Sequence, residues 1–298
     1  MLEPGLHLLC LALVAADLIA RALRIKCLLG GLDCRITLVD ALRLNAYGDA
    51  ACAVTPLRLG GEPARLAGML AARVPASAGF VAISLEVLAA WPVIIAAAVT
   101  VFLLFGRDWW AAAGPALASA AASGWPWVVA LVIASIVAWL VARRWIRRPG
   151  SRLVRRPLRR VAVYWRRMPA LPLLASAPMT LVNLASRVGL LVVLAQALPQ
   201  PPELAPLVVG SFVLIYSQLF LPTPSGVGVV DLGFLSGAAG DLGPAEASLL
   251  FWWRFYTSGL GILLGALMFL LAWATRRRIR YISPRPPDTI SREELHQS

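Results

Sequence analysis

The sequence has few charged residues and few of the side chains that carry most enzyme chemistry. Of its 298 residues, 14% are charged and 59% are hydrophobic, which excludes an ordinary soluble domain and predicts a membrane protein. Its four cysteines lack a CxxC spacing and its two histidines lie near opposite ends, so neither a zinc site nor a disulfide framework is predicted. We therefore expect no metal and no other cofactor.

Motifs for nucleotide binding and catalysis are also missing. Lys26 is the only lysine, and no GxxxxGK sequence followed by Ser or Thr is present, so a P-loop is excluded. An SxxK pair, a GxSxG turn and an internal histidine that could act as a general base are absent. The sequence therefore predicts a protein that is not an enzyme, and an integral-membrane enzyme acting on lipids stays as a weaker hypothesis.

The positive charge is large but is confined to two regions. The 28 basic and 15 acidic side chains give a net charge of +13; 11 arginines fall between Arg143 and Arg167, and 6 more follow Ala274. A nucleic-acid-binding protein would carry this charge on a soluble surface. Because the clusters lie between or after apolar runs, they indicate cytoplasmic loops that face anionic membrane lipids, and no nucleic-acid partner is predicted.

Five apolar segments are long enough to cross a membrane as helices. They are residues 6–23, 76–105, 125–142, 171–198 and 248–274. The first could be mistaken for a signal peptide, but basic residues follow its apolar stretch instead of preceding it, so we expect a retained helix.

A sixth apolar stretch, residues 36–57, is predicted to enter the membrane and return. As a lipid-exposed crossing it would be costly, because it contains Asp40, Arg43, Asn45, Asp49 and Pro56. The loops on its two sides both carry basic residues, so both flanks should be cytoplasmic; these residues are Arg24, Lys26, Arg35, Arg58, Arg65 and Arg73.

A seventh stretch, residues 205–239, is predicted to turn back from the opposite face. Its helix should stop midway, where the sequence places Pro222, Pro224, Ser225, Gly226 and Gly228. Its flanks, residues 199–206 and 240–247, contain no Lys or Arg, so both should be external.

These patterns predict an all-α integral membrane protein with about five transmembrane helices and two opposed re-entrant or broken helical hairpins. Residues 1–275 should form one domain of a multi-pass protein of the cell membrane, with the N-terminus outside and residues 276–298 as a basic cytoplasmic tail. Irregular backbone at membrane depth must be covered by protein or water. We therefore expect the two hairpin tips to meet around a polar cavity in a pseudo-symmetric core.

Three motifs occur in a recognisable order. They are NAYGDAACAVTPLRLGGEPAR at 45–65, LPTPSGVGVVD at 221–231 and WRFYTSGLG at 253–261. They resemble, in turn, the N…P-x-R-x-G-E-x-x-R element, the P-T-P-G-G-x-G-x-x-E turn and the arginine-bearing last helix of a flippase-like membrane family. That family is named after the transmembrane region of lysylphosphatidylglycerol synthases, and the resemblance covers about residues 15–275.

Some positions depart from the family pattern. Ser225 replaces a glycine, and Asp231 replaces the glutamate. Glu86 is kept, but Val87 stands where relatives often carry an arginine, so the motif does not support a paired role for Glu86. Residues 20–29, ARALRIKCLL, match the end of the family's second helix, from which we expect that a first helix is missing.

The resemblance implies movement of a lipid between leaflets, such as an aminoacylated phosphatidylglycerol, another glycerophospholipid or a lipid-linked sugar. The fused synthases of the family attach a soluble aminoacyl-transferase domain after the membrane region. Because only 24 residues follow Ala274, we do not expect the synthase activity in this chain.

Ionisable side chains inside apolar segments are the first candidates for a functional site, because each costs about 2.5–3.5 kcal/mol at a helix centre. They are Asp17, Arg43, Asp49, Glu86, Arg187, Asp231 and Arg254. Two readings stay open: internal ion pairs that fix helix packing, or a headgroup path in which arginines bind lipid phosphate and carboxylates meet an amine. We expect headgroup contact for Arg254 and favour structural pairing for Arg187 and Asp17.

The family motifs add candidates in the two hairpins. Arg58 and Arg65 fall near one face if the segment is helical, with Glu62 within a turn of each, and we expect them to capture a headgroup at the cytoplasmic mouth. A solvated pair that only sets topology is the alternative. Backbone amides at the proline- and glycine-rich turn can bind an anion, and Asp231 is placed to cap the following helix. The candidate substrate-binding residues are therefore Asn45, Asp49, Arg58, Glu62, Arg65, Glu86, Arg187, Pro222, Pro224, Ser225, Gly226, Gly228, Asp231 and Arg254.

Two functions from different classes follow from the sequence. The leading hypothesis is a lipid translocator whose transport is downhill or coupled to an ion gradient, with Glu86, Asp49 or Asp231 as candidate proton carriers. The alternative is a non-catalytic membrane partner of a lipid-modifying or glycan-assembly complex. The expected partners are a phospholipid or lipid-linked substrate and anionic membrane lipids.

Overall fold

The computed structural model describes residues 4–55, 58–147, 152–198, 203–218, 231 and 244–275, and the regular elements in these ranges are helical. The α-helices are α1 (Pro4–Gly31), α2 (Leu38–Val54), α3 (Gly61–Ala71), α4 (Ala76–Arg147), α5 (Arg152–Arg167), α6 (Ala170–Ala195), α7 (Leu204–Ser217), α9 (Pro244–Arg254) and α10 (Leu260–Thr275). A π-helical turn, Phe255–Gly259, joins α9 to α10. The prediction of an all-α integral membrane protein is confirmed.

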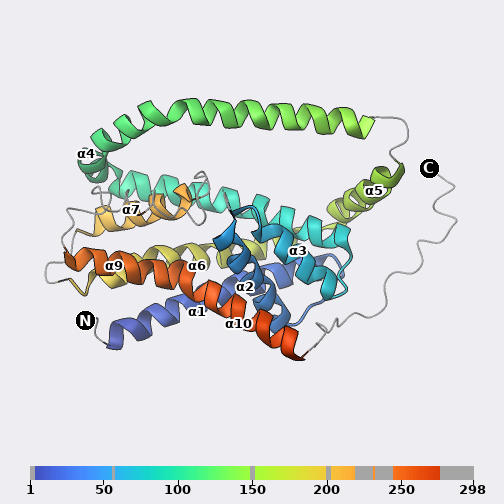
Figure 1. Ribbon diagram of the computed structural model, residues 1–298, viewed down its shortest axis with the longest axis horizontal. Helices are drawn as coiled ribbons and strands as arrows, with labels where there is room; N and C mark the ends of the chain where they lie inside the picture. Colours follow the sequence, from blue (N-terminus) through green and yellow to red (C-terminus); the bar gives the residue numbers. More distant parts are fainter. Residues whose placement is uncertain are drawn as a thin grey trace.

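Four stretches of helix in the described residues are long and apolar enough to cross a membrane. They are Pro4–Gly31, Ala76–Arg107, Ala170–Ala195 and Ser248–Leu271, and each coincides with a predicted span. The fifth predicted span, 125–142, lies in the second half of α4 and is helical. Figure 1 shows α4 running toward the end of the molecule that holds the N-terminus, bending there and returning.

The first helix is longer than the sequence predicts. We expected it to end at residue 23, with Arg24 in a cytoplasmic loop, but α1 continues to Gly31. Both Arg21 and Arg24 therefore lie inside a candidate span. The prediction was wrong because basic residues at the end of an apolar run usually mark the membrane surface. In this chain they bind carboxylates of other helices inside the protein.

Helices α1 and α6 form the centre of the molecule, and their ends pack in two separate apolar clusters. The first cluster contains Ile25 and Leu28 of α1 together with residues of α2, α3 and α4. The second contains Cys10 and Val14 of α1 together with Leu190 of α6 and residues of α7 and α9. The middle turns of α1 and α6 lie between these clusters, and this is where the polar side chains gather.

The first predicted hairpin differs from the structure in its bounds. Residues 38–54 form one helix, α2, and the returning arm is α3, which packs against α2 and lies in the stretch 58–73 that we expected to be a cytoplasmic loop. Thr37 caps the start of α2 by accepting a hydrogen bond from the backbone N–H of Asp40 at 3.1 Å. Glycine lets the two helices approach closely: a Cβ at Gly48 would lie 2.8 Å from Cγ of Arg65, and a Cβ at Gly61 would lie 2.2 Å from Sγ of Cys52. The turn between the helices is directed toward the interior of the molecule (Figure 1).

The second predicted hairpin is described only in part. Its first arm is α7, which ends at Ser217 with Gln218 as the C-cap. The predicted turn residues Pro222, Pro224, Ser225, Gly226 and Gly228 lie outside the described residues, whereas Asp231 lies within them. Figure 1 shows α7 starting at the N-terminal end of the molecule and pointing toward the α2–α3 turn.

The last helix packs closely on the first hairpin through two glycines spaced four residues apart. A Cβ at Gly265 would lie 2.3 Å from the carbonyl oxygen of Ala46, and one at Gly261 would lie 3.2 Å from Oδ2 of Asp49. This is the small-xxx-small pattern that lets membrane helices approach at backbone distance. It holds α2 against α10 and places Asp49 at the helix interface.

Candidate functional site

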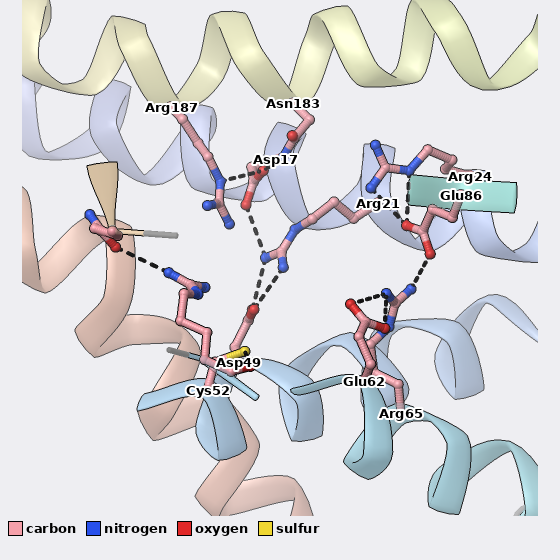
Figure 2. A network of polar contacts seen from close by, with 12 residues as sticks. Asp17, Arg21, Arg24, Asp49, Cys52, Glu62, Arg65, Glu86, Asn183 and Arg187 are labelled. Atoms are coloured by element: carbon pink, nitrogen blue, oxygen red, sulfur yellow. Dashed lines mark hydrogen bonds and ion pairs between the residues drawn. The ribbon is translucent and has the colours of Figure 1, made fainter. Parts of the chain in front are cut away.

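A polar layer crosses the molecule at the middle of its two central helices. Asp17, Arg21 and Arg24 follow one another at spacings of four and three residues, so they lie on one face of α1. Thr180, Asn183 and Arg187 lie in the same way on α6. Figure 2 shows these two faces turned toward each other.

Asp17 joins α1 to α6. Its carboxylate accepts hydrogen bonds from Nδ2 of Asn183 and, at 3.3 Å, from Nε of Arg187. The structural pairing expected for Arg187 and Asp17 is present, and Asp17 lies in the centre of the layer with 6% of its surface exposed. An isolated carboxylate would be costly at this depth, and its three partners offset that cost.

Arg21 joins α1 to the first hairpin. Its guanidinium donates two hydrogen bonds to Asp49 at 2.8 and 2.9 Å and lies 3.0 Å from Asp17. Burial alone would raise the pKa of Asp49, which lies outside the four candidate spans, but the charge and hydrogen bonds of Arg21 outweigh it. The pKa of Asp49 therefore lies below its usual range, and the carboxylate stays charged.

Glu86 joins three helices. Oε1 accepts from Arg24 of α1 at 2.7 and 2.9 Å, and Oε2 accepts from Arg65 of α3 at 2.5 Å. Arg24 also donates to Thr180 of α6 at 3.1 Å. The family motif did not support a paired role for Glu86, because Val87 replaces an arginine. Glu86 is paired nevertheless: both partners come from other helices, so position 87 is not needed.

Arg58 connects the two hairpins. It lies between α2 and α3 in the left-handed backbone region, with φ of 57°, and its guanidinium donates to Oε1 of Gln218 at 3.1 Å. Gln218 is the C-cap of α7, so this contact brings the end of α7 to the α2–α3 turn. Within the described residues Arg58 has no carboxylate partner.

We expected Arg58, Glu62 and Arg65 together at the cytoplasmic mouth, and this was wrong for the two arginines. Arg58 lies at the hairpin turn, and Arg65 is buried against Glu86. Only Glu62 remains at the surface, with half of its side chain exposed, where it pairs with Arg65 at 3.1 Å. The seven-residue spacing predicted a shared face, but α3 begins only at Gly61, after Arg58.

Hydrogen-bond donors exceed acceptors in this layer. Among the described residues of the layer, five guanidinium groups face four carboxylates, those of Asp17, Asp49, Glu62 and Glu86. On α1, α2 and α3, three buried side-chain N–H groups have no acceptor within the described part of the chain: Nε of Arg21, Nε of Arg65 and Nδ2 of Asn45. A buried donor without a partner is costly, so the layer is complementary to an oxygen-rich anion.

Two further candidate residues, Arg254 of the last membrane segment and Asp231 of the second hairpin, pair with each other, which the sequence did not predict. Nε of Arg254 donates to Oδ1 of Asp231 at 2.8 Å, which links the two family motifs that contain these residues. We expected Asp231 to cap the helix that follows it, and the residues of that helix lie outside the described part of the chain. Directly after Arg254 the helix widens into the π-helical turn, a feature frequent at functional sites.

Sequence reasoning missed several members of the layer, namely Arg21, Arg24, Thr180, Asn183 and Gln218. Four of them could have been found from the sequence, because polar residues recur at helical spacing along 17–24 and 180–187, and each range predicts one polar stripe on an apolar helix. Gln218 lies in neither range. No group of three or more His, Cys, Asp or Glu side chains in the described part of the chain could hold a metal ion.

Comparisons with known proteins give one finding. A family model described as the lysylphosphatidylglycerol synthase TM region matches residues 1–265. No curated protein and no solved structure matches the chain.

Proposed function

The chain belongs to the family of the lysylphosphatidylglycerol synthase TM region, and from this premise we propose that it moves a phosphate-bearing lipid between the leaflets of the cell membrane. The headgroup would pass through the polar layer where the two hairpins approach each other. The acyl chains would stay in the bilayer. We propose translocation and no catalytic step.

One observation carries this proposal: the buried layer holds more cationic donors than anionic acceptors, halfway along the candidate spans. Ion pairs that only fix helix packing would need balanced charge and complete hydrogen bonding. A lipid phosphate carries negative charge and several oxygen acceptors, and arginine binds such groups through paired hydrogen bonds. Transporter sites are typically found near the bilayer midplane between broken helices.

The geometry also favours movement of the lipid down its own gradient over coupling to a proton gradient. Asp49, Glu86 and Asp231 are the candidate proton carriers, and each accepts hydrogen bonds from at least one arginine. Because the charge and hydrogen bonds of Arg21 stabilise the charged carboxylate of Asp49, proton uptake by Asp49 is disfavoured. We therefore propose downhill movement, in which a lipid phosphate exchanges with these carboxylates as the partner of the arginines.

The test is reconstitution into liposomes that carry a fluorescent phospholipid in both leaflets, followed by a membrane-impermeant quencher. A translocator lets the quencher remove more than the outer-leaflet fraction of the fluorescence, whereas protein-free liposomes stop at that fraction. Labelled phosphatidylglycerol, phosphatidylethanolamine and phosphatidylcholine would rank the headgroups. Quenching that stops at the outer-leaflet fraction for every lipid would refute the proposal.

The variant Arg254→Lys distinguishes a translocator from the alternative, a non-catalytic membrane partner. A scaffold needs only a folded protein, so this charge-conserving change should leave it working. A translocator should lose transport, because lysine cannot reproduce the forked hydrogen bonds of arginine. Monodisperse elution in detergent must accompany the loss for it to count.

A further inference from the structure

A second basic feature lies away from the polar layer, at the junction between the end of α1 and the start of α2. A pocket of about 530 Å³ is lined there by Lys26, Gly30, Arg35, Ile36, Thr37 and Leu38. This volume lies within the range of small-molecule and headgroup sites. Most of the lining is apolar, and the two cations supply its charge.

Neither cation has a partner in the described part of the chain. Lys26 and Arg35 are exposed and make no ion pair or side-chain hydrogen bond there. Asp33, the acidic residue nearest to Arg35 in the sequence, pairs with neither of them. This contrasts with the arginines on the inner faces of α1 and α3, which bind carboxylates.

The pocket also lies at headgroup depth. Lys26 and Gly30 belong to the last turns of the candidate span Pro4–Gly31, so the pocket opens where this helix leaves the apolar core of a membrane. Long cationic side chains at such ends reach the lipid phosphates, and their stems cover apolar surface. Basic pockets between transmembrane helices are known to bind anionic headgroups.

We propose that this pocket binds one anionic phospholipid of the surrounding leaflet as a resident ligand. Lys26 and Arg35 bind its phosphate, and Leu38 together with the apolar stems of the two cations contacts the glycerol and the first methylenes of the chains. This lipid is not transported, because the pocket faces the end of α1 and not the polar layer. The inference stands independently of the translocation proposed above.

Photo-crosslinking tests the proposal in proteoliposomes made from equal amounts of phosphatidylglycerol and phosphatidylcholine. A benzophenone amino acid replaces Leu38, which lines the pocket, and mass spectrometry identifies the lipid adducts. Two cations at a membrane surface should favour the anionic lipid by about 10- to 30-fold. The preference should disappear in the combined Lys26→Gln and Arg35→Gln variant, whose two changed side chains are exposed and not needed for folding.

Two controls make the outcome decisive. The same benzophenone at Val39, which is exposed beside the pocket but does not line it, should crosslink both lipids equally. Arg166→Gln with Arg167→Gln removes two exposed charges of α5 and should keep the preference at Leu38. Equal crosslinking of both lipids at Leu38, or a preference that survives the loss of Lys26 and Arg35, would overturn the proposal. Translocation is not measured, so the two proposals fail separately.

Discussion

At the scale of single residues, Glu86 shows how a membrane protein keeps charge in its interior. Its carboxylate is 2% exposed and holds Arg24 and Arg65 on opposite sides, so two cations depend on one anion. Glu62 pairs with Arg65 as well, but half of the Glu62 side chain is exposed. The two glutamates therefore offer a matched comparison of buried and exposed pairing.

We predict that Glu86→Gln lowers the free energy of unfolding by about 3 kcal/mol or more, because it leaves the buried guanidinium of Arg24 without a counter-charge and that of Arg65 with only the half-exposed Glu62. Glu62→Gln should cost less than about 1 kcal/mol, since its ion pair is largely exposed. Denaturant titration of both variants in the same detergent measures the difference. Equal losses of unfolding free energy in the two variants would show that burial does not make the ion pairs of Glu86 more important for stability than the exposed pair of Glu62.

Arg21 gives a second prediction at this scale. Arg21→Lys keeps the positive charge, but an ammonium group cannot donate the paired hydrogen bonds to Asp49 and reach Asp17 at the same time. We expect at least a tenfold loss of lipid translocation, corresponding to about 1.4 kcal/mol, with a smaller loss of stability. Full activity in Arg21→Lys would mean that charge alone, and not the forked geometry, is what the layer requires.

At the scale of elements, close packing of α10 on α2 depends on a missing side chain. We predict that Gly265→Ala destabilises the protein by about 1–3 kcal/mol, because the new Cβ would meet the backbone carbonyl of Ala46 and the helices must move apart. Gly5→Ala is the control, since nothing lies within 4 Å of its Cβ position. Thermal unfolding in detergent compares the two, and a stable Gly265→Ala protein would contradict the packing.

The elements were more predictable than the site. Long apolar runs predicted the spans, and basic flanks on both sides of residues 36–57 predicted that the chain turns back there, because both signals are local in the sequence. The position of the turn was missed, since the returning arm is α3, which lies in the expected loop. The pairs of Glu86 are not local: Arg24 and Arg65 lie on other helices, and only the fold brings them together. The length of α1 was missed because Arg21 and Arg24 look like flanking charge until their acidic partners are known.

At the scale of the whole molecule, the chain has a basic end and an end without basic loops. Figure 1 places α5 at one end of the long axis, and the N-terminus and the start of α9 at the other. By the positive-inside rule the end with α5 should face the cytoplasm. This is the orientation that the sequence predicts, with the N-terminus outside.

Thiol labelling in intact cells tests this orientation. In a variant without its own cysteines, Arg166→Cys on α5 should react with an impermeant maleimide only after the cells are opened. Glu203→Cys at the start of α7 should react from outside, since both positions are exposed at opposite ends. The reverse pattern would place the N-terminus in the cytoplasm and contradict the topology.

The central claim is that a lipid phosphate passes where the end of α7 meets the α2–α3 turn, and Arg58 is the cation that lies there without a carboxylate partner in the described residues. The most direct measurement compares translocation by Arg58→Gln and Arg43→Gln in the same liposomes. Arg43 lies on the same hairpin but pairs with Asp40 near the start of α2, at 3.6 Å. We predict that Arg58→Gln slows translocation about tenfold or more, while Arg43→Gln stays close to the unmodified protein. Equal rates for the two variants would contradict the account.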